Sequence, residues 1–234
     1  MSAFQGGAAA GTMFNMLFAN KLGRRKVIFL GSIVSVIGSA LQGGAAAMAM
    51  LIIGRFIGGM AVGMLTSTIP MFAAEIAPAK YRGLQSGLLQ WFLSWGFLVA
   101  QWLGFGFEKI NGSIQWRFPL AFQCVPALIL VIGIFFLQES PRWLVEQDRH
   151  DEARRVLQKL RSDGSLEQEQ FVELELKEII DVVAADRAHN QTSWKTIFLK
   201  PSWRKRLLLG CGVQAFGPLS GISEFESTIS ISID

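Results

Sequence analysis

The chain has 234 residues, of which 51% are hydrophobic and 24 are glycine, and its formal net charge is +4. This is far more apolar sequence than one soluble core could bury, so the composition excludes an ordinary soluble domain. The two cysteines, Cys124 and Cys211, fall inside apolar stretches, and neither a disulfide framework nor a zinc site is expected.

Uncharged runs close to the length of a membrane-spanning helix recur along the chain. They cover residues 2–20, 27–51, 56–74, 84–107 and 118–138, and a shorter run covers residues 207–223. Residues 139–203 between the last two runs are polar and charged. We therefore predict an all-α, polytopic membrane helix bundle over residues 1–138, a cytoplasmic helical domain over 139–203, the start of a further helix at 204–223, and an atypical tail at 224–234.

Basic residues gather at alternate ends of these runs. One set of ends carries Lys21, Arg24, Arg25, Lys26, Lys80, Arg82, Arg142, Arg204, Lys205 and Arg206. The opposite set carries only Lys109 and Arg117, beside Glu108, and includes an uncharged turn expected near Gly44. Because loops rich in lysine and arginine stay in the cytoplasm, we predict that the first set of ends is cytoplasmic. The net positive charge follows from this bias and gives no support to nucleic-acid binding.

Glycines occur four residues apart within the runs, at Gly7 and Gly11, Gly59 and Gly63, and Gly83 and Gly87. Such pairs lie on one helix face and allow a neighbouring backbone to approach closely. They favour a helix bundle and no narrower function.

Two polar residues stand out inside the apolar runs. Arg55 would be costly near the bilayer centre, so we expect it to pair within the bundle or to reach the interface rather than to contact a substrate. Gln90 can both donate and accept hydrogen bonds, as a sugar hydroxyl requires. The neighbouring Trp91, Phe92 and Trp95 could face a sugar ring, although a lipid-facing or packing role is more common for such residues.

Several motifs in a fixed order resemble those of the sugar porters of the major facilitator superfamily. They are residues 20–26 (NKLGRRK), the series 54–83 with Gly54, Arg55, Pro70, Glu75 and Arg82, residues 139–144 (ESPRWL), and residues 219–222 (LSGI). Trp116, Arg117 and Pro119 are similar to fungal members. The resemblance covers nearly the whole chain to residue 222 and implies family helices two to six, followed by the start of helix seven. The sequence is thus expected to cover roughly the first half of a transporter.

The resemblance implies a charge network that opens and closes the cytoplasmic side, formed by Arg24, Arg25, Glu75, Arg82, Glu139 and Arg142. It implies Gln90 as a sugar-binding residue, with Gln214 as a second candidate. The chain departs from the family pattern at Met16, where glycine is usual, and at Gly217 and Pro218, where two glutamines are usual.

The function implied is transmembrane sugar transport by alternating access at the plasma membrane. Its partners would be a small-molecule sugar and membrane lipid, without a cofactor or metal, and coupling to protons (symport) is left open. The alternatives are a truncated product that does not transport and a sugar sensor on the transporter fold. A membrane enzyme is the weakest alternative, because the sequence offers no set of nucleophile, base and metal ligands.

Overall fold

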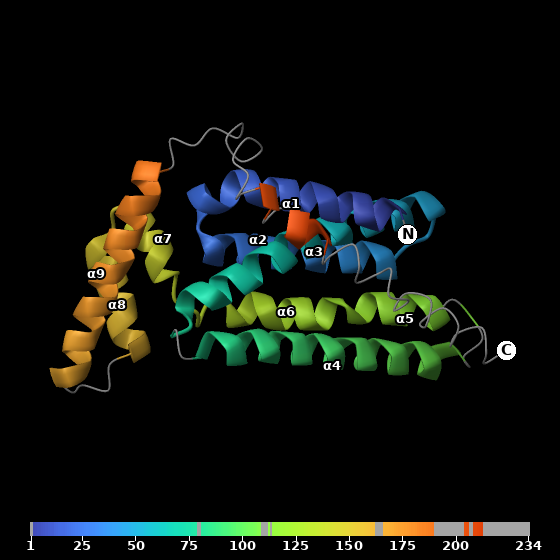
Figure 1. The fold of residues 1–234 in the computed structure, drawn as a ribbon. Coiled ribbons are helices and arrows are strands. Elements are labelled where there is room, and N and C mark those ends of the chain that lie inside the picture. Colours follow the sequence, from blue (N-terminus) through green and yellow to red (C-terminus); the bar gives the residue numbers. More distant parts are fainter. Residues whose placement is uncertain are drawn as a thin grey trace. The chain divides into compact units, whose positions relative to one another are not determined.

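A computed structural model describes residues 2–78, 81–108, 112, 114–161, 166–189, 204–205 and 208–212. The helices follow one another as α1 (Ser2–Leu22), α2 (Arg24–Gly43), α3 (Met48–Ile76), α4 (Arg82–Glu108), α5 (Ile114–Phe122), α6 (Cys124–Gly133), α7 (Pro141–Glu146), α8 (His150–Arg161) and α9 (Leu166–His189) (Figure 1). No strand occurs among the described residues, so the predicted all-α class is confirmed.

The chain divides into two compact units, residues 1–180 and residues 181–234. The predicted helix at 204–223 lies in the second unit, where residues 204–205 and 208–212 are helical. The rest of that helix and the tail at 224–234 lie outside the described residues. The domain limits at residues 138 and 203 remain predictions.

Four segments of the described chain are long and apolar enough to cross a membrane: Arg24–Gly43, Met48–Ile76, Gly83–Phe107 and Ile114–Gly133. The predicted run at 2–20 folds as helix α1 but is not among these four segments. The limits of the four segments also correct two predicted runs. The run at 27–51 extends across the uncharged turn expected near Gly44, because α2 ends at Gly43 and α3 begins at Met48. Arg55 consequently lies within α3, toward its first turns.

The last of these segments is interrupted between α5 and α6, at Gln123. Pro126 explains the break, because proline has no N–H to donate to the carbonyl of Phe122 and its ring crowds that carbonyl. The predicted run at 118–138 therefore starts too late and combines parts of two helices.

Glycines set the contact between α1 and α3. A Cβ atom added at any of four positions would collide with a backbone carbonyl of the facing helix: Gly7, Gly11, Gly59 and Gly63. These pairs confirm the predicted close approach of helices. In contrast, a Cβ at Gly83 or Gly87 of α4 would meet nothing within 4 Å among the described residues. The glycine spacing alone could not distinguish a packed pair from an uncovered one.

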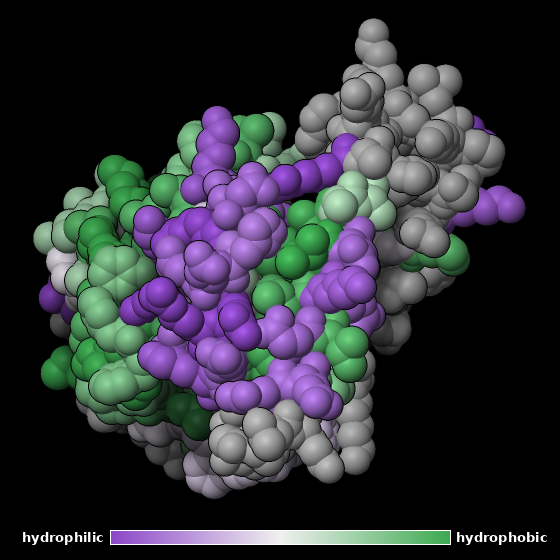
Figure 2. Space-filling model, turned by 90° about the vertical axis from the view of Figure 1, so that its left-hand side faces the viewer, coloured by the Kyte–Doolittle hydropathy of each residue, from purple (hydrophilic) through white to green (hydrophobic). Residues whose placement is uncertain are grey.

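The polar segment folds into α7, α8 and α9. In α8 the side chains of Ala153, Val156 and Leu157 are buried on one face, as their spacing predicts. α7 and α8 lie beyond the ends of the long helices at which α1 ends and α2 begins (Figure 1). Figure 2, viewed from this side, shows hydrophilic residues gathered across the middle of the face. This end of the bundle, which carries Asn20, Arg24, Glu75 and Glu139, is termed the charged end below.

Candidate functional site: a buried charge network

Arg24, the first residue of α2, is the centre of the charged end. Its side chain is only 2% exposed, and its guanidinium lies 3.1 Å from Glu75 Oε1 and 3.5 Å from Glu146 Oε2. It also donates to Asn20 Oδ1 at 3.3 Å. These three acceptors belong to α3, α7 and α1, so one side chain connects four helices.

The Arg24–Glu75 pair is shielded from water on both sides, since the Glu75 side chain is 7% exposed. The desolvation penalty of burying two charges offsets much of their attraction. Removing one partner, however, leaves the other charge buried and uncompensated. Glu75 Oε2 and Arg24 Nε also lack hydrogen-bond partners among the described residues. Glu75 Oε2 can therefore accept one further hydrogen bond, and Arg24 Nε can donate one.

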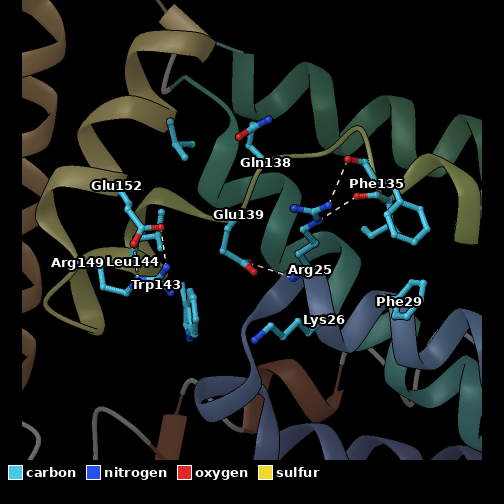
Figure 3. A pocket seen from close by; sticks show the side chains of 12 residues that line it. Arg25, Lys26, Phe29, Phe135, Gln138, Glu139, Trp143, Leu144, Arg149 and Glu152 are labelled. Atoms are coloured by element: carbon cyan, nitrogen blue, oxygen red, sulfur yellow. Dashed lines mark hydrogen bonds and ion pairs between the residues drawn. The ribbon is translucent and has the colours of Figure 1, made fainter.

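Arg25 and Glu139 form a second junction, and Figure 3 shows both side chains. Glu139 Oε1 accepts from the backbone N–H of Arg25 at 3.1 Å, while the Arg25 guanidinium donates to the carbonyls of Ile134 at 3.0 Å and Phe135 at 3.2 Å. These carbonyls follow the last turn of α6, where backbone acceptors lack helical partners and a cation is favoured. The side chain of Arg25 thus caps α6, while the backbone N–H of Arg25 is held by the Glu139 carboxylate.

Arg142 joins the network through a residue that the sequence analysis missed. Its Nε lies 3.8 Å from Glu146 Oε1, one turn further along α7, and Glu146 also contacts Arg24. The spacing of four residues after Arg142 in a helix opened by Pro141 could have indicated Glu146. The side chain of Arg82 lies outside the described part of the chain, so its place beside Glu75 stays a prediction.

Gly23 is the single residue between α1 and α2, with φ of +91°. A Cβ atom there would lie 3.0 Å from Glu139 Oε2 and 3.2 Å from the Trp143 ring. Glycine is thus favoured twice, by the left-handed backbone and by the close approach of α7. The Ser140 hydroxyl accepts from the Trp143 N–H at 3.3 Å and caps α7, which fixes the position of Trp143.

The predicted sugar-binding residues lie elsewhere. Gln90 is exposed on α4, and no residue in the apolar window of that helix is buried by the described chain. Gln214 lies outside the described residues. Arg55 is partly exposed and forms no hydrogen bond or ion pair with any described residue. No described group of three or more His, Cys, Asp or Glu side chains could hold a metal ion.

Four membrane-length segments among the described residues, with a buried arginine–carboxylate pair at one end, define the chain as a polytopic helical membrane protein. Residues 1–226 match the family described as "Sugar (and other) transporter". The chain belongs to this family, which consists of transporters and not of enzymes.

Proteins of similar sequence support this family assignment. The chain is 43% identical over 219 residues to the MFS-type transporter criB of Aspergillus cristatus, covering 92% of this chain and 47% of that protein. It is 35% identical over 218 residues to a high-affinity glucose transporter of Kluyveromyces lactis, covering 93% of this chain and 39% of that protein. The chain therefore spans less than half the length of these relatives.

Solved structures show the same fold. The proton:xylose symporter XylE bound to 6-bromo-6-deoxy-D-glucose superposes with a TM-score of 0.71 at 22% identity, over 85% of this chain and 44% of that chain. The inward open conformation of the xylose transporter XylE from E. coli gives 0.61 at 26% identity, over 76% of this chain and 44% of that chain. The major facilitator fold predicted from the motifs is thus confirmed.

Proposed function

We propose that the protein contributes to transmembrane sugar transport by alternating access, with the charged end facing the cytoplasm of a plasma-membrane transporter. Membership of a sugar-transporter family supports the substrate class. The bias of lysine and arginine toward the charged end supports the orientation. The structurally similar XylE is described as a proton:xylose symporter, and coupling to protons is left open.

The observation that carries the proposal is the buried Arg24–Glu75 pair with its extension to Glu146. In alternating access, the cytoplasmic side must close in one state and open in another. A network that connects α1, α2, α3 and α7 at that side would stabilise one of these states. In a buried ion pair, the desolvation penalty nearly cancels the attraction between the charges. A modest binding energy of the substrate can therefore shift the equilibrium between the closed and the open state. Arg25, Arg82, Glu139 and Arg142 are proposed to complete this latch.

Gln90 is proposed to face the sugar. It is exposed on α4, and no residue in the apolar window of that helix is buried by the described chain, as expected of a helix lining a path between two halves of a transporter. Arg55 is proposed to pair within the helix bundle or to reach the membrane interface rather than to contact the sugar. Gln214 remains a second candidate for sugar binding.

A chimera tests the proposed transport. The 218 residues that match the Kluyveromyces lactis glucose transporter would replace the corresponding segment of that protein. The chimera would be expressed in yeast lacking its own hexose transporters. We expect saturable uptake of radiolabelled glucose or xylose. Glu75→Ala should lower the maximal rate far more than the affinity for sugar, whereas Glu173→Ala on the exposed face of α9 should not. A chimera that reaches the cell surface and takes up neither sugar contradicts the proposal.

The 234-residue chain expressed alone should insert into membranes but give only background uptake, because Gln90 would then face lipid or water without opposing polar groups. This is the outcome expected of a product that does not transport by itself. Saturable uptake by the chain alone, abolished by Gln90→Ala, would instead show that assembly of the chain with itself suffices.

A further inference from the structure

A pocket of about 450 Å³ lies at the charged end, between the start of α2, the end of α6, and helices α7 and α8 (Figure 3). An adjoining pocket of about 430 Å³ runs along α8 and shares Gln138, Glu152 and Val156 with the first. The two form one groove on the side of α8 that faces the end of α6. The buried Arg24–Glu75 pair does not line it.

The groove has excess positive charge. Lys26 lines the first pocket, and Arg155 and Lys159 line the second. All three side chains are exposed, and none forms an ion pair with a described residue. The acidic residues of the first pocket are already engaged: Glu152 pairs bidentately with Arg149 at 2.8 and 2.6 Å, and Glu139 accepts from two backbone N–H groups at 3.1 and 3.2 Å. The second pocket adds one further carboxylate, Asp151, so the lining of the whole groove has five basic and three acidic side chains. An anion would thus find three cations outside ion pairs and two carboxylates that are already engaged.

The opposite wall of the groove is apolar. Phe29 and Phe135 line it and pack edge to face, with ring centroids 5.5 Å apart. Phe135 is 63% exposed, and the following Phe136 is 82% exposed. These rings lie where the apolar segment of α6 ends, which is the level of the lipid headgroups in a membrane. A small water-soluble anion would gain little from exposed phenylalanines, whereas a lipid would bury them beside its acyl chains.

We propose that this groove binds the headgroup of an anionic phospholipid of the cytoplasmic leaflet. The phosphate lies near Lys26, the rest of the headgroup extends along α8 toward Arg155 and Lys159, and the acyl chains descend over Phe135 and Phe136. Basic pockets at the cytoplasmic ends of membrane helices bind anionic headgroups for this electrostatic reason. Because Arg25 lines the groove and also caps α6, a bound lipid would stabilise the junction between α2 and α6.

Native mass spectrometry of the purified 234-residue chain in mild detergent tests the proposal. The probes are phosphatidylglycerol and phosphatidylcholine with identical acyl chains, and inorganic phosphate as a competitor. We expect tighter binding of phosphatidylglycerol. Lys26→Gln/Lys159→Gln should weaken phosphatidylglycerol binding roughly fivefold for each charge removed and leave phosphatidylcholine binding unchanged.

Lys21→Gln/Lys177→Gln is the matched control, because it removes the same charge from exposed positions outside the groove. It should change phosphatidylglycerol affinity less than twofold. Equal weakening by the control would overturn the proposal in favour of general surface attraction, as would equal affinity for both lipids. Full displacement of phosphatidylglycerol by millimolar inorganic phosphate would assign the groove to a free anion and overturn the lipid assignment. Unchanged helical circular dichroism in each variant checks that the fold is retained.

Discussion

The indole Nε1 of Trp143 donates a 2.8 Å hydrogen bond to the backbone carbonyl of Asn20. This carbonyl lies in the last turn of α1, where no further helical N–H is available to satisfy it. Gln147 donates to the same oxygen at 3.3 Å. The start of the polar segment is thus fixed to the end of a long helix by capping contacts as well as by ion pairs.

Trp143→Phe should lower the thermal stability of the chain in detergent. The substitution retains most of the apolar ring, which is 5% exposed, but removes the donor to Asn20. We expect the free energy of unfolding to fall by only about 1 kcal/mol, since Gln147 still donates to the Asn20 carbonyl. Trp102→Phe is the control, because Trp102 is 71% exposed. Thermal melting followed by circular dichroism compares the two, and equal melting temperatures would refute the capping role.

Gly59→Ala should destabilise the bundle, because its Cβ would collide with the carbonyl of Phe4 on α1. The helices would have to separate, so we expect a loss of about 1–3 kcal/mol, as for other overpacked sites. Gly87→Ala meets nothing within 4 Å among the described residues and should be neutral or gain up to about 1 kcal/mol from helix propensity. Resistance to unfolding by dodecyl sulfate measures both variants. An effect of Gly87→Ala as large as that of Gly59→Ala would mean that the contact of α1 with α3 is not responsible.

Two arginines of α8 pair with glutamates of α9 in different settings. Arg161 is 11% exposed, binds Glu175 through two contacts of 3.0 Å, and donates to the carbonyl of Ile76 at the end of α3. Arg154 pairs with Glu173, and both side chains are about half exposed.

Arg161→Ala should therefore increase hydrogen exchange in residues 166–180 of α9 and at the end of α3, whereas Arg154→Ala should change it little. The difference arises because an exposed ion pair contributes about 0–1 kcal/mol and a shielded, bidentate pair with a third acceptor contributes more. Hydrogen exchange followed by mass spectrometry resolves these segments. Identical exchange in the two variants would show that Arg161 does not fix α8 and α9 to α3.

The orientation follows from charge and can be measured directly. In a variant with Cys124 and Cys211 replaced by serine, Ala46→Cys in the turn between α2 and α3 should react with an impermeant thiol reagent added to intact cells. Lys177→Cys on α9 should react only after permeabilisation, because the charged end is predicted to be cytoplasmic. Both positions are exposed in the structure. Labelling of Lys177→Cys from outside would reverse the proposed topology.

The sequence predicted the helical class better than the helix limits. Apolar length located the four membrane-length segments, and the alternation of charged and uncharged loops implied the turn near Gly44. The break at Gln123 involves no charged residue, so hydropathy alone could not place it. Motif order predicted that arginines and carboxylates meet at one end. It could not predict that Arg25 would bind carbonyls instead of a carboxylate, because that choice depends on where α6 ends. The spacing from Arg142 could have indicated Glu146 as its partner, but the contact of Glu146 with Arg24 depends on the position of α7.

The Arg24–Glu75 pair permits the sharpest test of the charge network. Arg24→Ala and Glu75→Ala each leave a buried charge without its partner, so each should cost about 3–5 kcal/mol of stability. The double variant leaves neither charge and should cost less than the sum of the two, with a coupling energy of about 0.5–3 kcal/mol. Arg142→Ala is a useful comparison, because its side chain is 42% exposed and its contact with Glu146 is long, at 3.8 Å. Its effect should stay near 1 kcal/mol or less. Dodecyl sulfate unfolding of the unmodified chain, the two single variants and the double variant provides the cycle. Strict additivity of Arg24→Ala and Glu75→Ala would show that the two side chains do not act as a pair.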